Sequence, residues 1–217
     1  MSAETVAVVD YGMGNLRSVS KAVEHVAAGR VDVRVTDDAR EIENADRIVF
    51  PGQGAMRDCM AELGAHGLLD PMRACLGAKP VLGICMGLQV LFEMSDEAPD
   101  TPGLGWLAGG AVRFPADAVD AQGRRLKVPH MGWNRVRQRM DHPLWRGIDD
   151  AERFYFVHSY HVCPGDPGVV AGTSEYGPEF TAAAAGERLF AVQFHPEKSQ
   201  RAGLALLSNF LAWDGCA

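Results

Sequence analysis

The feature that most constrains the fold is a regular alternation of short apolar segments and helical patterns over the first 94 residues. Apolar, mostly β-branched segments lie at 5–9, 31–35, 47–50 and 80–84. Helical spacing or helix caps follow them at 15–28, 37–45, 55–77 and 86–94, with an interruption near 64–67. Strands that alternate with helices in this way predict a largely parallel sheet with helices on both faces.

The second half of the chain has a different rhythm. An acidic, proline-rich segment at 95–105 predicts a loop. Short segments of alternating polarity predict antiparallel strands at 110–114, 133–136, 154–159, 169–173, 179–184 and 189–194, and 197–213 has the spacing of an amphipathic helix. We find no internal repeat and no linker rich in glycine or serine, so we expect one domain that covers residues 1–217.

Charge and cysteine content narrow the class of protein. The chain of 217 residues has a net charge of −7 and no dense run of lysine or arginine, so we expect neither nucleic acid nor an anionic membrane as a partner. The longest apolar stretch, 80–92, is too short to span a bilayer, and the first residues lack the pattern of a secretion signal. Five cysteines without a C-x-x-C pair predict a reducing, cytoplasmic environment and argue against a disulfide framework or a zinc site.

The strongest chemical signal is Cys85, which stands between Gly83 and Gly87 where a buried strand is predicted to meet a helix. Flanking glycines permit the sharp turn that pushes a side chain out of the backbone at such a junction. A helix N-terminus favours the thiolate, and the N–H of Met86 is placed to stabilise an oxyanion. The pattern favours a nucleophile over a buried, inert cysteine.

A second signal is the run His195-Pro196-Glu197. Pro196 biases His195 toward an extended backbone, and residues two apart in an extended segment point to the same side. A carboxylate beside an imidazole fixes its tautomer and stabilises the imidazolium, so Glu197 is predicted to orient His195. Alone, the pair also suits a surface contact at a helix start. Together with Cys85, it supplies a nucleophile, a base and an orienting group.

A third signal is the glycine-rich run that follows the predicted strand at 47–50. Because the carboxyl ends of parallel strands meet at the same edge of a sheet, we expect this run to lie beside Cys85. Gly52 and Gly54 flank Gln53, so backbone N–H groups can approach a substrate and complete an oxyanion hole. An ordinary strand-to-helix turn is the alternative.

Six segments of the chain carry a resemblance to a known family. They lie at 10–16, 51–55, 83–89, 129–134, 157–160 and 194–199, and they include the patterns Gly-x-Cys-x-Gly-x-Gln and Phe-His-Pro-Glu-Lys-Ser. With these segments the chain resembles the triad-type glutamine amidotransferases, and among them most closely the glutaminase subunits of imidazole glycerol phosphate synthase. Gln53 departs from the family's pattern, which more often has an apolar residue there.

The resemblance implies a fold and a reaction. The fold class is α/β, a flavodoxin-like, doubly wound, largely parallel sheet with added antiparallel strands in the C-terminal half. In the implied reaction, Cys85 attacks the side-chain amide of L-glutamine, His195 carries the proton to the leaving ammonia, and Glu197 orients His195. The implied activity needs no cofactor and no metal.

The resemblance also implies a substrate site and a partner. The ammonia would pass to a separate cyclase subunit in a heterodimer of histidine biosynthesis. The implied glutamine and oxyanion residues are Gly52, Gln53, Met86, Gln89, His158, Ser159 and Tyr160, and the implied interface residues are Asn15, Trp133 and Lys198.

The same residues also suggest other interpretations. His158 and His161 fall on one predicted strand, where residues three apart point to opposite faces and cannot share a metal. The segment at 10–15 is similar to half of a dinucleotide-binding loop but lacks the third glycine. Three alternatives stay open: an amidotransferase subunit of another synthase, a flavodoxin-like binding or redox-sensing protein in which an exposed Cys85 becomes oxidised, and a free-standing cysteine hydrolase. The other four cysteines are expected to be core or surface thiols.

Overall fold

The computed structural model of the chain describes residues 4–120 and 122–216, so the predicted domain limits at residues 1 and 217 lie outside the described part. The N-terminal half confirms the predicted alternation. Its strands are β1 (Glu4–Val9), β2 (Val31–Thr36), β3 (Arg47–Gly52) and β4 (Val81–Cys85), and its helices are α1 (Leu16–Ala27), α2 (Ala39–Asn44), α3 (Met56–Ala65) and α4 (Leu69–Cys75). The strands lie in the order β2-β1-β3-β4, and all their pairings are parallel.

The C-terminal half extends the same sheet with mostly antiparallel strands. These are β5 (Phe92–Ser95), β6 (Leu107–Arg113), β7 (His130–Gln138), β8 (Glu152–His158), β9 (Tyr160–Pro164), β10 (Val170–Glu175), β11 (Glu179–Gly186) and β12 (Leu189–Val192). The sheet continues from β4 through β12, β11, β10 and β7 to β8, while β9 pairs with β11 and β6, and β5 pairs with β6. Strand β12 is parallel to β4 and antiparallel to β11, so the sheet changes character at β12.

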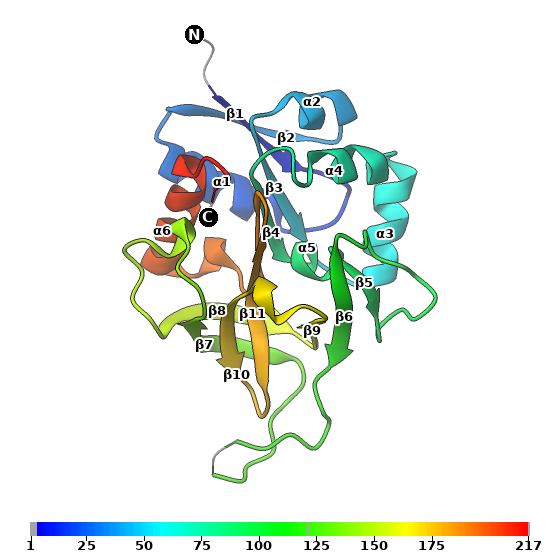
Figure 1. Cartoon of the computed structure of the whole chain (residues 1–217), viewed down its shortest axis with the longest axis vertical. Helices are drawn as coiled ribbons and strands as arrows, with labels where there is room; N and C mark the ends of the chain where they lie inside the picture. The colour runs from blue at the N-terminus through cyan, green and yellow to red at the C-terminus, as the bar shows by residue number, and fades with distance from the viewer. Residues whose placement is uncertain (1–3, 121, 217) are drawn as a thin grey trace.

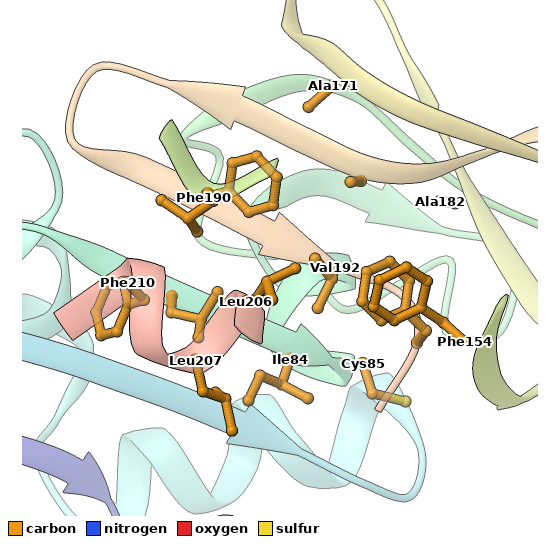
Figure 2. Close-up of a cluster of buried hydrophobic side chains, with 14 of the residues drawn as sticks. Ile84, Cys85, Phe154, Ala171, Ala182, Phe190, Val192, Leu206, Leu207 and Phe210 are labelled. Carbon is orange, nitrogen blue, oxygen red and sulfur yellow. The ribbon is translucent and has the colours of Figure 1, made fainter. Parts of the chain in front are cut away.

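Helices cover both faces of the parallel part (Figure 1). Helices α1 and α6 (Gln200–Ala212) pack on one face, where Val19 and Phe210 are buried. Helices α2, α3 and α4 pack on the other face through side chains such as Ile42 and Leu63. Figure 2 shows part of the buried hydrophobic cluster beneath α1 and α6, with Cys85 at its edge. The nucleophile candidate therefore stands at the margin of a packed core.

Several predicted boundaries are wrong. The helix expected at 86–94 is one turn, α5 (Met86–Gln89), because the chain then forms β5 and pairs in parallel with β6. An apolar run of this length does not distinguish helix from strand, so the pairing partner decides. Strand β9 was missed. The predicted terminal helix begins only at Gln200, after a short 3-10 helix at Pro196–Lys198.

The predicted placement of the two histidines is also wrong. His158 ends β8 and His161 lies on β9, so they belong to two strands. Both rings pack against Phe114, with ring centroids 5.2 Å and 4.7 Å away. Among residues 4–120 and 122–216, no group of three or more His, Cys, Asp or Glu side chains is arranged to hold a metal ion. No helix in those ranges is both long and apolar enough to cross a membrane.

Candidate active site

Cys85 sits at a strained junction between a strand and a helical turn. It is the last residue of β4, and its φ of 58° lies in the left-handed region that non-glycine residues rarely occupy. Such a conformation costs on the order of 1–3 kcal/mol and persists only where the surroundings enforce it. The side chain is 7% exposed.

Three glycines around Cys85 allow very close packing. A Cβ on Gly87 would collide with the carbonyl oxygen of Phe50, and a Cβ on Gly83 would lie 2.9 Å from the Cβ of Ala191. Gly52 is opposite Cys85 in the register of β3 and β4, which places the predicted glycine-rich run beside the cysteine. The glycines are therefore needed for the approach of neighbouring backbone as well as for the turn.

The expected helix dipole is weak at this site. Helix α5 has four residues, and a single turn aligns few peptide dipoles. Any stabilisation of a Cys85 thiolate must therefore come mainly from neighbouring side chains and backbone N–H groups.

His195 is held at both its backbone and its ring. Its N–H donates to the carbonyl oxygen of Tyr155 at 2.9 Å, and its carbonyl accepts from the hydroxyl of Ser199 at 2.6 Å. Nδ1 of the ring lies 2.9 Å from Oε1 of Glu197. The side chains are 3% and 0% exposed, so the pair is shielded from water. The two residues meet as predicted, but Glu197 belongs to a 3-10 helix and not to an extended segment.

The charge of His195 is set by its two neighbours. Burial lowers the pKa of its imidazole, but the Cys85 thiolate and Glu197 raise it more, to about 9. His195 is therefore an imidazolium at neutral pH when Cys85 is ionised. Because Nδ1–H donates to Glu197, the Nε2 proton is the one that His195 can transfer. Nε2 is buried and makes no hydrogen bond within the described residues.

A cavity of about 440 Å³ brings most of the predicted site residues together. Its lining includes Gln53, Cys85, Met86, Gln89, His158, Ser159, Tyr160, His195 and Lys198 from the prediction, and Gly54, Glu97, Pro129 and Val157 beyond it. Gly52 lies behind this surface, packed against Tyr11, Met86 and Gly87. Glu197 does not line the cavity and contacts the ring of His195. A larger hollow, of about 880 Å³, lies elsewhere and contains neither Cys85 nor His195.

Gln89 offers the cavity a hydrogen-bond acceptor. Its Nε2 donates to the carbonyl oxygen of Tyr160 at 3.2 Å and to Oε1 of Gln193 at 3.0 Å. Its Oε1 is buried without a partner in the described chain. An N–H group of a bound ligand would satisfy a buried acceptor of this kind.

Comparison with known proteins identifies the family. Residues 7–213 match the class-I glutamine amidotransferase family. The chain is 60% identical over 209 residues to the imidazole glycerol phosphate synthase subunit HisH of Aromatoleum aromaticum, covering 96% of this chain and 98% of that protein. It is also 60% identical over 210 residues to the same subunit of Thiobacillus denitrificans, covering 96% and 91%.

The chain belongs to the HisH family of class-I glutamine amidotransferases. Among solved structures, it is similar to a glutamine amidotransferase with a TM-score of 0.71 and 18% identity, covering 95% of this chain and 97% of that one. It is also similar to a glutamine amidotransferase of Thermotoga maritima, with a TM-score of 0.60 and 17% identity, covering 93% and 80%. These likenesses confirm the predicted α/β fold class with its largely parallel sheet.

Sequence reasoning missed three residues at the site of this HisH-family chain. Gln193 is fully buried, and its Nε2 lies 3.8 Å from Sγ of Cys85. His130 contacts His158, and the hydroxyl of Tyr11 donates to the carbonyl of Pro51 at 2.9 Å. For Gln193 a signal was available, because a glutamine within the apolar segment 189–194 must find buried partners.

The predicted interface residues come from three different segments of the chain. Lys198 is partly exposed at the rim of the cavity. Trp133 lies on β7 and is 44% exposed beside Met131, which is 62% exposed. Asn15 precedes α1 and is partly buried. Two large apolar side chains exposed together on one strand are typical of a protein-binding surface.

Proposed function

We propose that the chain hydrolyses L-glutamine to glutamate and ammonia through a thioester on Cys85. The ammonia passes to the cyclase subunit of imidazole glycerol phosphate synthase, in histidine biosynthesis in the cytoplasm. The observation that carries the proposal is the meeting of Cys85 with the buried His195–Glu197 pair at one cavity. We propose one glutamine amidotransferase domain, continuous across the sheet.

In the first step the Cys85 thiolate attacks the carboxamide carbon of glutamine. A C–S bond forms and the carbonyl oxygen becomes an oxyanion. As the oxyanion collapses, the C–N bond breaks and the nitrogen takes the Nε2 proton of His195, leaving as ammonia. Glu197 keeps its hydrogen bond to Nδ1, so the imidazole stays aimed at the reacting atoms.

In the second step water hydrolyses the thioester. Neutral His195 takes a proton from water, and the oxygen adds to the thioester carbon. The C–S bond then breaks, which restores the Cys85 thiolate beside the imidazolium. Glutamate leaves and gives its carboxyl proton to the solvent, so glutamine and water become glutamate, ammonia and one released proton.

The remaining predicted residues receive roles around this centre. The N–H groups of Met86 and Gln53 serve as the oxyanion hole, with the backbone at Gly52 beside them. Gln89, His158, Ser159 and Tyr160 form the glutamine site. Asn15, Trp133 and Lys198 contact the cyclase, whose docking encloses the cavity so that ammonia does not meet bulk water.

Replacement of Cys85 tests the proposal directly. Cys85→Ala should abolish glutamine hydrolysis in the complex while cyclase turnover with added ammonium salt continues, because only the first half-reaction needs a thiolate. The measurement is glutamate release and cyclase product with each nitrogen source. Cys163→Ala, which removes an exposed thiol away from the cavity, is the control. Residual glutaminase above a few per cent in Cys85→Ala would sink the assignment.

A further inference from the structure

Gln193 connects the sulfur of Cys85 to a chain of buried polar groups. It follows β12, is 0% exposed, and lies between Cys85 and Gln89. Its Nε2 is 3.8 Å from Sγ of Cys85, and its Oε1 accepts from Nε2 of Gln89 at 3.0 Å. Neither the triad nor the proposed glutamine site assigns this side chain a role.

The direction of these hydrogen bonds is fixed by one backbone carbonyl. The carbonyl oxygen of Tyr160 can only accept, so the atom of Gln89 that faces it, at 3.2 Å, must be the amide nitrogen. The same nitrogen faces Gln193, so Gln193 must present its oxygen there. Its own nitrogen is then turned to Cys85. A flipped Gln193 would set its nitrogen against the nitrogen of Gln89.

His158 also contacts the Tyr160 carbonyl, and His130 contacts His158 in turn. Nδ1 of His158 lies 2.8 Å from this oxygen and must donate to it. Nε2 of His158 is then an acceptor, and Nδ1 of His130 donates to it at 3.0 Å. Nε2 of His130 accepts in turn from Nδ2 of Asn134 at 3.3 Å. In the series from Tyr160 to Asn134, each of these donors has an acceptor when the rings of His158 and His130 are both neutral.

We propose that Gln193 donates a hydrogen bond to the Cys85 thiolate and that the shared Tyr160 carbonyl enforces this orientation. The inference rests on Cys85 being the nucleophile of the proposed function, and it adds a residue to that site. A hydrogen bond to an anion is stronger than one to a neutral acceptor, so the contact favours the thiolate over the thiol. The contact also stabilises negative charge on the sulfur, as the dipole of a helix longer than α5 would have done.

Few other groups compete for this role. Cys85 interacts electrostatically with His195, Tyr11 and Cys59. Two further charged side chains, Glu97 and Lys198, line the same cavity. Burial raises the pKa of Tyr11 well above its usual range and that of Cys59 to about 11, so both are neutral near pH 7. His195 supplies the charge, and Gln193 supplies a neutral donor that does not depend on pH.

The test is the pH dependence of alkylation at Cys85 in the full chain. Iodoacetamide labelling of Cys85, followed by peptide mass spectrometry, reports the thiolate fraction. Gln193→Met keeps the volume and removes the donor, so labelling below the pH midpoint should be about tenfold slower and the midpoint should rise. Gln193→Glu, which sets a carboxylate against the sulfur, should shift the midpoint further in the same direction.

Enzyme kinetics and a matched control complete the experiment. In the complex with the cyclase, Gln193→Met should lower the glutaminase kcat about tenfold with KM within about twofold. The control is Gln138→Met, which removes an amide that donates to the carbonyl of Ile148 away from the cavity. An unchanged midpoint in a folded Gln193 variant, or an equal shift in Gln138→Met, would overturn the proposal. A parent complex without glutaminase activity would instead refute the proposed function, and the labelling profile would still report on Gln193.

Discussion

The parallel and antiparallel halves of the sheet contribute to the site by different physical means. The parallel half places Cys85 through backbone geometry, with a left-handed φ of 58° and glycines that admit neighbouring strands at close range. The segments beyond β4 contribute His195, His158 and His130, whose protonation is controlled by side-chain hydrogen bonds and burial. The nucleophile should therefore respond most to added atoms, and the base most to changed charge.

The largest expected effect comes from adding a single methyl group in the parallel half. Gly87→Ala would drive a Cβ into the carbonyl oxygen of Phe50, which is backbone and cannot yield, so we expect little folded protein. Gly64→Ala in α3 is the control, because its Cβ would meet only the side chain of Leu69 on α4, at 3.7 Å. Alanine there should leave stability unchanged or raise it by up to about 1 kcal/mol. The measurement is thermal unfolding of the two variants. A stable Gly87→Ala protein would contradict the view that close backbone packing positions Cys85.

A smaller effect is expected from changing charge without shape at the base. Glu197→Gln removes a group that raises the pKa of His195, so glutaminase kcat should fall roughly 100-fold and the alkaline limb of its pH profile should move to lower pH. The matched control is Glu62→Gln in the exposed pair with His66, where Oε2 lies 3.8 Å from Nε2. That change should be nearly silent. An unmoved alkaline limb in Glu197→Gln would show that the carboxylate does not tune His195.

The smallest effect is a pH dependence of stability with opposite signs for two sets of histidines. Burial lowers the pKa of His130 to about 4 and that of His158 to about 3, against about 6.5 in the unfolded chain. Below pH 6.5 the unfolded chain binds protons that the folded chain does not, so the free energy of unfolding falls as the pH falls toward 4. At pH 5 each of these two histidines costs roughly 2 kcal/mol.

His195 acts in the opposite direction. Its pKa is raised to about 9, so its stabilisation is complete below about pH 6.5 and is lost as the pH rises through 9. Thermal unfolding between pH 5 and 9.5 should show both limbs. His130→Gln should flatten the acid limb only, and His195→Gln the alkaline limb only. Equal slopes in parent and variants would contradict the buried, neutral state of the first pair or the charged state of the second.

The features predicted correctly from the sequence are those that depend on residues close together in the chain. Alternating patterns gave the parallel strands, and the two-residue spacing of His195 and Glu197 predicted their contact, although a 3-10 turn produces it. The expected helix at 86–94 was wrong because the fate of 92–95 depends on pairing with β6, which lies beyond any local window.

The series of hydrogen-bonded polar side chains that begins at Cys85 could not be predicted from the sequence. His130 and His158 are 28 residues apart, and Gln89 and Gln193 are 104 apart, so no spacing rule connects them. Their contacts exist only because β7 pairs with β8, and because β12 pairs with β4. The sequence predicts that a buried amide needs hydrogen-bond partners, but only the sheet topology determines which residues they are.

The place of β12 in the sheet also bears on how the protein is made. This strand is the last of the twelve to be translated, yet it lies at the centre, between β4 and β11. A nascent chain that lacks it has two separate sheet fragments and a cysteine without a base. Contacts between β4 and β12 span about a hundred residues, and non-local pairing of this kind slows folding. We therefore expect a nascent chain without β12 to lack glutaminase activity, because Cys85 and His195 come together only when the central strand joins the sheet.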